Sequence, residues 1–275
     1  MVASDLGATN KSISTMSEAV IIQYSSGAPL SIDAIRDDLL ALGVRSGDTL
    51  LVHSSLSTIG WVCGGPVSVI MALESALTVS GTLVMPAHTS HVSDPALWCN
   101  PTVPPAFDPD VTPTRGMGVI PECFRSQADV LRSNHPHDSF VARGPHAGEI
   151  VSDHPLQNGL GENSPLGALY DLDAKVLLLG VGHESNTSLH LAEYRARYPN
   201  KRDVTNGAPV LVGGKRRWAT IRHLDYKVSD FNRIGHAFAQ ETRASSFGYI
   251  GRAQSILFSM RDLVDYAVGW MEQNR

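Results

Sequence analysis

Apolar residues recur along most of the chain in two periods, one typical of amphipathic helices and the other of buried strands. Helical spacing occurs in the segments 31–44, 66–77, 118–126, 164–172, 187–198 and 263–273. Short apolar runs, typical of strands, occupy 49–56, 81–87, 139–144 and 175–182. Because the two kinds of element alternate, the sequence predicts a layered α/β fold with a largely parallel or mixed sheet.

Three segments depart from this alternation. Residues 88–114 hold six prolines and predict an irregular connection. The stretch PVLVGGKRRWATIRHLDY (209–226) predicts a hairpin that turns at Gly213-Gly214, and this hairpin either makes the sheet mixed or adds a small α+β lobe. Residues 1–28 are rich in Ser, Ala and Thr, and we expect a flexible N-terminal extension ahead of a single domain, 29–275.

Composition narrows the class of protein. The 275 residues are 43% hydrophobic and 18% charged, as in a globular protein, and the formal charge is −5 without a cluster of Lys and Arg, which argues against a nucleic-acid partner. No apolar run could span a bilayer and no export pattern opens the chain. The three cysteines, Cys63, Cys99 and Cys123, are widely spaced, which favours a reducing compartment. We therefore expect a cytoplasmic protein without a membrane partner, as a monomer or a homodimer.

The stretch KVLLLGVGHESNTSLHLAEY (175–194) carries the strongest candidate chemistry. It predicts a strand, a turn and a helix on which Glu193 follows His190 by one turn, so that the carboxylate could orient the imidazole as a general base. Thr187 could offer its hydroxyl to a developing oxyanion. Two alternatives remain open from spacing alone. The histidine and glutamate could be an incidental pair on a surface helix, or they could join His183 as the zinc ligands of a metal-dependent hydrolase.

Two glycine- and serine-rich segments could bind a cofactor. LLVHSSLSTIGWVCGG (50–65) follows a predicted strand, and its backbone N–H groups would suit a phosphate or an amide-rich linker, although it is neither a P-loop nor a dinucleotide fingerprint. It could equally be a plain βα turn. The segment 116–118 precedes another helix and repeats the theme. Because no GxSxG elbow occurs, we interpret the histidine as a base that acts on an external nucleophile.

Five blocks together resemble the aminoglycoside 3-N-acetyltransferase family, in its order and over about residues 30–205. They are VHSSLSTIG, TRGMGVIPECFR, HPHDSFVARGPHA, GENSPLG and LLLGVGHESNTSLHLAEYRARYPNKR. The resemblance implies direct acetyl transfer from acetyl-CoA to the 3-amino group of a 2-deoxystreptamine antibiotic, hence antibiotic resistance, and no metal. It also implies a mixed sandwich, so the predicted fold is a layered α/β/α sandwich with a mixed, largely parallel sheet.

The resemblance implies roles for individual residues. His190 would take the proton from the attacking amine, Glu193 would support its ring, and Thr187 matches the threonine three residues earlier. Acetyl-CoA would be held by His53, Ser54, Ser55, Leu56, Ser57, Arg115, Gly116, Met117, Gly118 and Ser139. Cationic sugars need carboxylates, and the candidates for substrate binding are Asp94, Asp108, Asp110, Asp225, Asp230 and the rim residues His183 and Glu184. The alternatives are an acetyltransferase for a different amine, a binding module without turnover, and the metal-dependent hydrolase.

Overall fold

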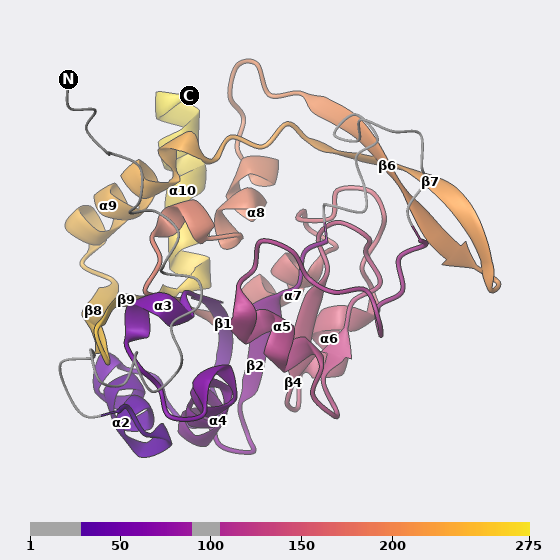
Figure 1. Ribbon diagram of the computed structural model, residues 1–275. Helices are drawn as coiled ribbons and strands as arrows, with labels where there is room; N and C mark the ends of the chain where they lie inside the picture. The colour runs from indigo at the N-terminus through magenta and orange to yellow at the C-terminus, as the bar shows by residue number, and fades with distance from the viewer. Residues whose placement is uncertain (1–28, 90–104) are drawn as a thin grey trace, which may run out of the picture.

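The computed structural model describes residues 29–89 and 105–275 (Figure 1). The segment 1–28, predicted as a flexible extension, lies outside the described residues. Within the described ranges, seven strands form the main sheet, in the order β3-β4-β2-β1-β5-β9-β8. Their bounds are β1 Thr49–Ser54, β2 Thr82–Pro86, β3 Leu131–Arg132, β4 Phe140–Arg143, β5 Lys175–Leu179, β8 Ser245–Ile250 and β9 Ala253–Ser259.

The sheet is parallel in its middle and antiparallel toward its edges. β1 pairs in parallel with β2 on one side and β5 on the other. β4 runs antiparallel to β2, and β9 runs antiparallel to β5. The predicted mixed sheet is therefore confirmed. The hairpin β6 (Asp203–Val212) and β7 (Lys215–Leu224) is a separate two-stranded sheet that extends away from the main one, so it adds a lobe (Figure 1).

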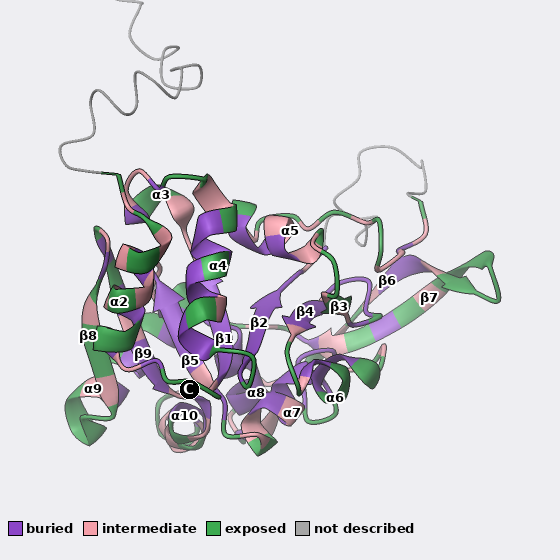
Figure 2. Cartoon of the chain, turned by 90° about the horizontal axis from the view of Figure 1, so that it is seen from below, coloured by how far each residue is buried: buried purple, intermediate pink, exposed green. Residues whose placement is uncertain are grey.

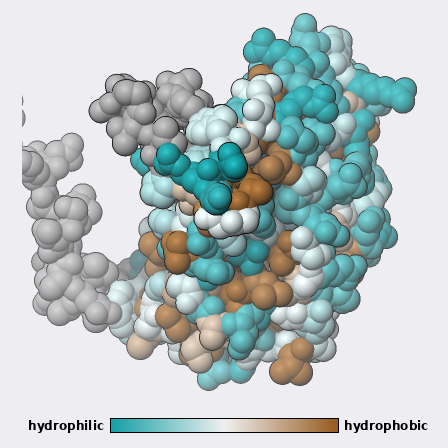
Figure 3. Space-filling view, turned by 90° about the vertical axis from the view of Figure 1, so that its right-hand side faces the viewer, coloured by the Kyte–Doolittle hydropathy of each residue, from teal (hydrophilic) through white to brown (hydrophobic). Residues whose placement is uncertain are grey.

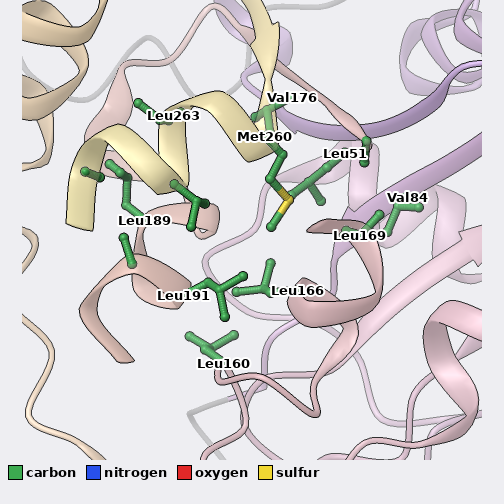
Figure 4. Close-up of a cluster of buried hydrophobic side chains, with 14 of the residues drawn as sticks. Leu51, Val84, Leu160, Leu166, Leu169, Val176, Leu189, Leu191, Met260 and Leu263 are labelled. Atoms are coloured by element: carbon green, nitrogen blue, oxygen red, sulfur yellow. The ribbon is translucent and has the colours of Figure 1, made fainter. Parts of the chain in front are cut away.

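Two helical layers cover the main sheet, because alternate strand residues point to opposite faces (Figure 2). Leu50 and Val52 of β1 pack under α2, α4 and α5, whereas Leu51 packs with the helices of the other face. Figure 4 shows that second cluster, which includes Leu189, Leu263 and Val176. The predicted α/β/α sandwich is thus confirmed. The helices of the described ranges are α2 Ile32–Leu42, α3 Leu56–Ile59, α4 Gly65–Leu77, α5 Val119–Arg125, α6 Ala147–Ser152, α7 Pro165–Asp171, α8 Ser188–Arg195, α9 Phe231–Thr242 and α10 Met260–Asn274, with 3-10 turns η3 His183–Ser185 and η4 Val228–Asp230.

Side-chain and glycine caps set the ends of α2 and the start of α7. The Ser31 side chain accepts the N–H of Ala34 at the start of α2, which ends at Gly43 with φ of 121°. Ser164 caps α7 by accepting the N–H of Leu166. The helix predicted for 187–198 is shorter, because α8 ends at Arg195. α9, β8 and β9 were not predicted.

On the face in Figure 3, hydrophobic side chains are interspersed with hydrophilic ones. No helix within residues 29–89 and 105–275 is both long and apolar enough to cross a bilayer.

Candidate active site

A cleft of about 650 Å³ lies at the carboxyl ends of the three parallel strands, where ligands of open α/β sheets usually bind. Its lining comes from the end of β1 and the following turn (53–57), from the segment 116–119 before and at α5, and from 184–187 before α8. His190, on the first turn of α8, also lines it. The fold therefore brings together three of the segments that the sequence singled out, although they are up to about 130 residues apart.

His190 and Glu193 form a buried pair and not a surface one. Their atoms Nδ1 and Oε2 are 2.6 Å apart, and the Glu193 side chain is fully buried. The spacing of three residues on α8 puts the two side chains on one face. With Nδ1–H donating to the carboxylate, Nε2 retains the lone pair. This geometry lets His190 accept a proton from a molecule in the cleft.

The second carboxylate oxygen of Glu193 is also occupied. Oε1 accepts the backbone N–H of Lys227 at 3.0 Å and Nη1 of Arg275 at 2.6 Å. Arg275 lies just after α10, and its guanidinium also pairs with Asp230. A buried carboxylate needs such partners, because an unpaired charge is costly in the interior.

Two aromatic rings fix the plane of the His190 imidazole. The ring centroid of Tyr226 lies 4.4 Å from that of His190, and the centroid of Phe231 lies 5.1 Å away. The Tyr226 hydroxyl is 3.2 Å from that of Tyr194. Burial raises the pKa of Tyr226, so its phenol stays protonated at neutral pH. The imidazole therefore lies between a carboxylate and an apolar wall.

Thr187 and His53 meet across the cleft, where the end of β1 faces the start of α8. Oγ1 of Thr187 is 3.4 Å from Nε2 of His53. Burial lowers the pKa of His53 to about 3, with smaller contributions from the histidines around it. Because His53 is neutral at neutral pH, it adds no positive charge to the cleft, which Thr187 and His190 also line.

The turn after β1 offers polar groups to the cleft. Oγ of Ser54 is buried and has no hydrogen-bond partner among the described residues. The N–H of Ser55 donates to the carbonyl of Leu179 at 3.0 Å, which ties this turn to the end of β5. Gly180 follows with φ of 70°, and a Cβ there would lie 1.9 Å from Oγ1 of Thr58. Only glycine fits where the chain after β5 comes this close to α3.

The structure brings most of the predicted cofactor residues to the cleft, with two exceptions. His53 to Ser57 and Gly116 to Gly118 all line it. Arg115 is exposed and outside the lining, and its N–H donates to the His88 carbonyl at 3.0 Å. Ser139 is fully buried away from the lining, because its hydroxyl donates to the Ala87 carbonyl and accepts from Nε of Arg132.

Of the predicted substrate-binding residues that fall within residues 29–89 and 105–275, Glu184 is the one that lines the cleft. His183 does not, because its ring packs inward, stacked on Phe258 at 5.3 Å and against Gly235. Nδ1 of His183 contacts the amide of Asn186, so the structure does not bring this residue together with His190 as a ligand set. Among residues 29–89 and 105–275, no cluster of three His, Cys, Asp or Glu side chains is arranged to hold a metal ion.

The predicted acidic candidates outside this segment do not line the cleft where they are described. Asp225 is exposed and pairs with Arg202 at 2.6 Å. Asp230 is buried against Arg275, and Asp108 accepts the N–H of Asp110 within its own loop. Asp94 lies outside the described residues.

Sequence reasoning missed three residues that contact His190 or Glu193 but lie far from them along the chain. They are Tyr226, Phe231 and Arg275. They follow α8 by more than thirty residues in the chain, and no local spacing relates them to His190. One signal was present: large aromatic side chains with a polar end, such as Tyr226, frequently border binding sites.

Comparison with known proteins gives one consistent result. A family described as aminoglycoside 3-N-acetyltransferase matches residues 51–272. An SPbeta prophage-derived aminoglycoside N(3')-acetyltransferase-like protein, YokD of Bacillus subtilis (strain 168), is 46% identical over 265 residues, covering 92% of this chain and 96% of the relative. Aminoglycoside N(3)-acetyltransferase VIII of Streptomyces fradiae is 36% identical over 277 residues, with 94% of this chain and 96% of the relative covered.

Solved structures agree with the sequence relatives. The crystal structure of YokD has a TM-score of 0.86 at 45% identity, covering 92% of this chain and 97% of that one. The binary complex of AAC-IIIb with CoASH has a TM-score of 0.82 at 31% identity, with 90% and 97% covered. AAC-VIa bound to sisomicin has a TM-score of 0.82 at 31% identity, with 90% and 99% covered.

Proposed function

This chain belongs to the aminoglycoside 3-N-acetyltransferase family, and from that membership we propose that it transfers the acetyl group of acetyl-CoA to the 3-amino group of a 2-deoxystreptamine aminoglycoside. The observation that carries the proposal is the imidazole of His190, which lines the cleft while its Nδ1 is held 2.6 Å from a fully buried carboxylate. Such activity would confer antibiotic resistance.

The chemistry is a direct transfer within a complex of enzyme, thioester and amine. An aliphatic amine is mostly protonated at neutral pH, so it must lose a proton before or during attack. Nε2 of His190 accepts one proton of the bound ammonium group, the neutral amine then forms the C–N bond, and Glu193 stabilises the resulting imidazolium. The tetrahedral oxyanion lies beside the Thr187 hydroxyl, which is suited to donate a hydrogen bond to it. When the C–S bond breaks, His190 passes its proton to the leaving thiolate of CoA, and the second proton of the attacking nitrogen goes to solvent as the amide forms.

The cofactor would occupy the part of the cleft between the turn 53–57 and the segment 116–118. The pantetheine arm is rich in amides, and the unpartnered hydroxyl of Ser54 is a group that such an arm could satisfy. Support also comes from AAC-IIIb, a relative by structure whose complex contains CoASH. The thioester would then lie next to His190, which lines the same cleft.

The acceptor would be a cationic sugar bound at the rim near Glu184. Burial alone would raise the pKa of Glu184, but hydrogen bonds from its own and the Gly182 backbone N–H groups and from Asn232 lower it. The carboxylate is therefore ionised at neutral pH and exposed where it can attract an ammonium group. AAC-VIa, another relative by structure, was solved with sisomicin bound.

The first test is a panel of aminoglycosides and unrelated amines incubated with acetyl-CoA. We expect CoA release, followed with a thiol reagent, for 2-deoxystreptamine compounds, and acetylation at the 3-amino group by NMR of the product. Release with unrelated amines alone would favour the alternative of a different acceptor. Acetyl-CoA binding without release for any amine would favour a binding module, and this proposal would be rejected.

We expect Glu184→Gln to raise KM for the aminoglycoside about two- to fivefold, because an exposed ion pair contributes little in water. KM for acetyl-CoA should stay unchanged, since the substitution removes a charge that faces the acceptor. Steady-state kinetics at low and high salt provide the measurement, and the difference between variant and wild type should shrink at high salt. Glu149→Gln, at an exposed site on α6, is the matched control. An equal rise in KM for acetyl-CoA would contradict the assignment of Glu184 to the acceptor.

A further inference from the structure

We propose that Arg275 is a positioning residue for the acetyl transfer, which holds Glu193 in the orientation that aligns the base His190. This inference rests on the function proposed above. Nη1 of Arg275 lies 2.6 Å from Oε1 of Glu193, while Oε2 of the same carboxylate lies 2.6 Å from Nδ1 of His190. The guanidinium and the imidazole therefore bind the two oxygens of one carboxylate. Any rotation of that carboxylate would break one contact or the other.

The guanidinium itself has little freedom. Its Nε and Nη2 donate to the two carboxylate oxygens of Asp230 at 2.9 Å and 2.6 Å, and Nη2 also donates to the Lys227 carbonyl at 2.8 Å. The Cζ atom of Arg275 lies 5.0 Å from the ring centroid of Tyr198. The Arg275 side chain is only 1% exposed. A planar, charged fork held on all its edges is a rigid support for a second carboxylate.

Other charged or titratable groups lie around His190, Glu193 and Arg275. They are His53, His88, Tyr198, Lys201, Tyr226, Lys227 and Asp230. The ammonium of Lys201 donates to the carbonyls of Tyr194 and Ala196. The ammonium of Lys227 lies 4.0 Å from Asp230. Arg275 thus differs from Lys201 and Lys227 in that its side chain donates directly to the Glu193 carboxylate. Burial alone would lower the pKa of Arg275, but hydrogen bonds to Asp230 and Glu193 raise it, so the guanidinium stays charged.

Anchoring of α10 is a simpler explanation for these contacts, and the structure offers a way to separate the two roles. α10 is already fixed by buried apolar side chains such as Leu263 and Met271. It is also fixed by Arg261, whose Nη2 donates to the carbonyls of Tyr170 and Asp171. Arg261, on α10 itself, is therefore a matched control, because it anchors the helix through Tyr170, Asp171 and Asp173 and not through Glu193.

The kinetic experiment compares Arg275→Met, Glu193→Gln and the double variant. Arg275→Met is expected to lower kcat about tenfold or more, with KM for acetyl-CoA within about twofold of wild type. The double variant should be no slower than Glu193→Gln alone, because the two residues act in series. Arg275→Lys should retain part of the rate. In Arg275→Ala, guanidinium ion should restore turnover where the same concentration of sodium chloride does not. Arg261→Met should keep wild-type kcat.

A second readout does not depend on turnover. In protein with ¹⁵N-labelled histidine, the Nδ1–H proton of His190 should give a downfield NMR signal, assigned by its loss in His190→Gln. Arg275→Met should shift or broaden that signal, whereas Arg261→Met should leave it unchanged. If the wild type acetylates no amine, the proposed function fails while this measurement still tests the positioning. A wild-type signal in Arg275→Met, or additive losses in the double variant, would overturn the inference.

Discussion

His190→Ala is expected to lower kcat by a factor on the order of 100 or more, because the attacking amine loses the base that removes its proton. The affinity for acetyl-CoA should change little, because the turn 53–57 and the segment 116–118 would hold the cofactor. Stopped assays of CoA release give the rate, and calorimetric titration gives the affinity. His146→Ala, at a half-buried histidine ahead of α6 and outside the cleft lining, is the control for loss of an imidazole elsewhere.

The pH dependence of this variant sharpens the same prediction. At higher pH, a larger fraction of the acceptor amine is already unprotonated, so the missing base matters less. The ratio of wild-type to variant kcat should therefore fall between about pH 7 and pH 9.5. A variant that keeps nearly the full rate at neutral pH would reject His190 as the base. A deficit that stays constant over this range would point to a structural role for the ring.

The central part of the fold was predictable because its signals are local. β1 and β5 are buried on both faces and therefore read as continuous apolar runs. The spacing of His190 and Glu193 was equally informative, since three residues on a helix suffice to bring two side chains together. β8 carried no comparable signal, because it lies at the edge of the sheet and most of its residues are exposed or half-buried.

The candidate site was predicted in part, and His183 explains the limit. The sequence places it directly beside Glu184, which suggests a shared role at the rim. In the short 3-10 turn η3, successive side chains point about 120° apart, so one neighbour faces the cleft while the other faces the interior. Arg275 lies 82 positions from Glu193, and only the packing of α10 beside α8 brings their side chains together. Spacing in the sequence cannot reveal such a contact.

Buried histidines should make the protein strongly sensitive to mild acid, the second large effect that we expect. Burial lowers the pKa of His53 to about 3, and those of His137 and His183 to about 4. The unfolded chain has the ordinary value of about 6.5, so it binds more protons than the folded protein between about pH 4 and 6.5. The free energy of unfolding is therefore complete above pH 6.5 and falls as pH decreases. At pH 5, each of these histidines should remove on the order of 2 kcal/mol.

The three together would remove roughly 6 kcal/mol, a large part of the 5–15 kcal/mol typical of a folded domain. Urea unfolding at about pH 7.5 and pH 5 should show a loss of at least this size, because burial also lowers the pKa of His88 to about 4 and that of His154 to about 3. His183→Gln removes one titrating ring whose place in the core is apart from the cleft lining, so it should reduce the loss between the two pH values by about 2 kcal/mol. His146→Gln, whose side chain is 43% exposed, should leave the loss as in wild type. If the wild type were equally stable at both pH values, the prediction would be wrong. These imidazoles, including that of His183 against Phe258, would then not be buried in neutral form.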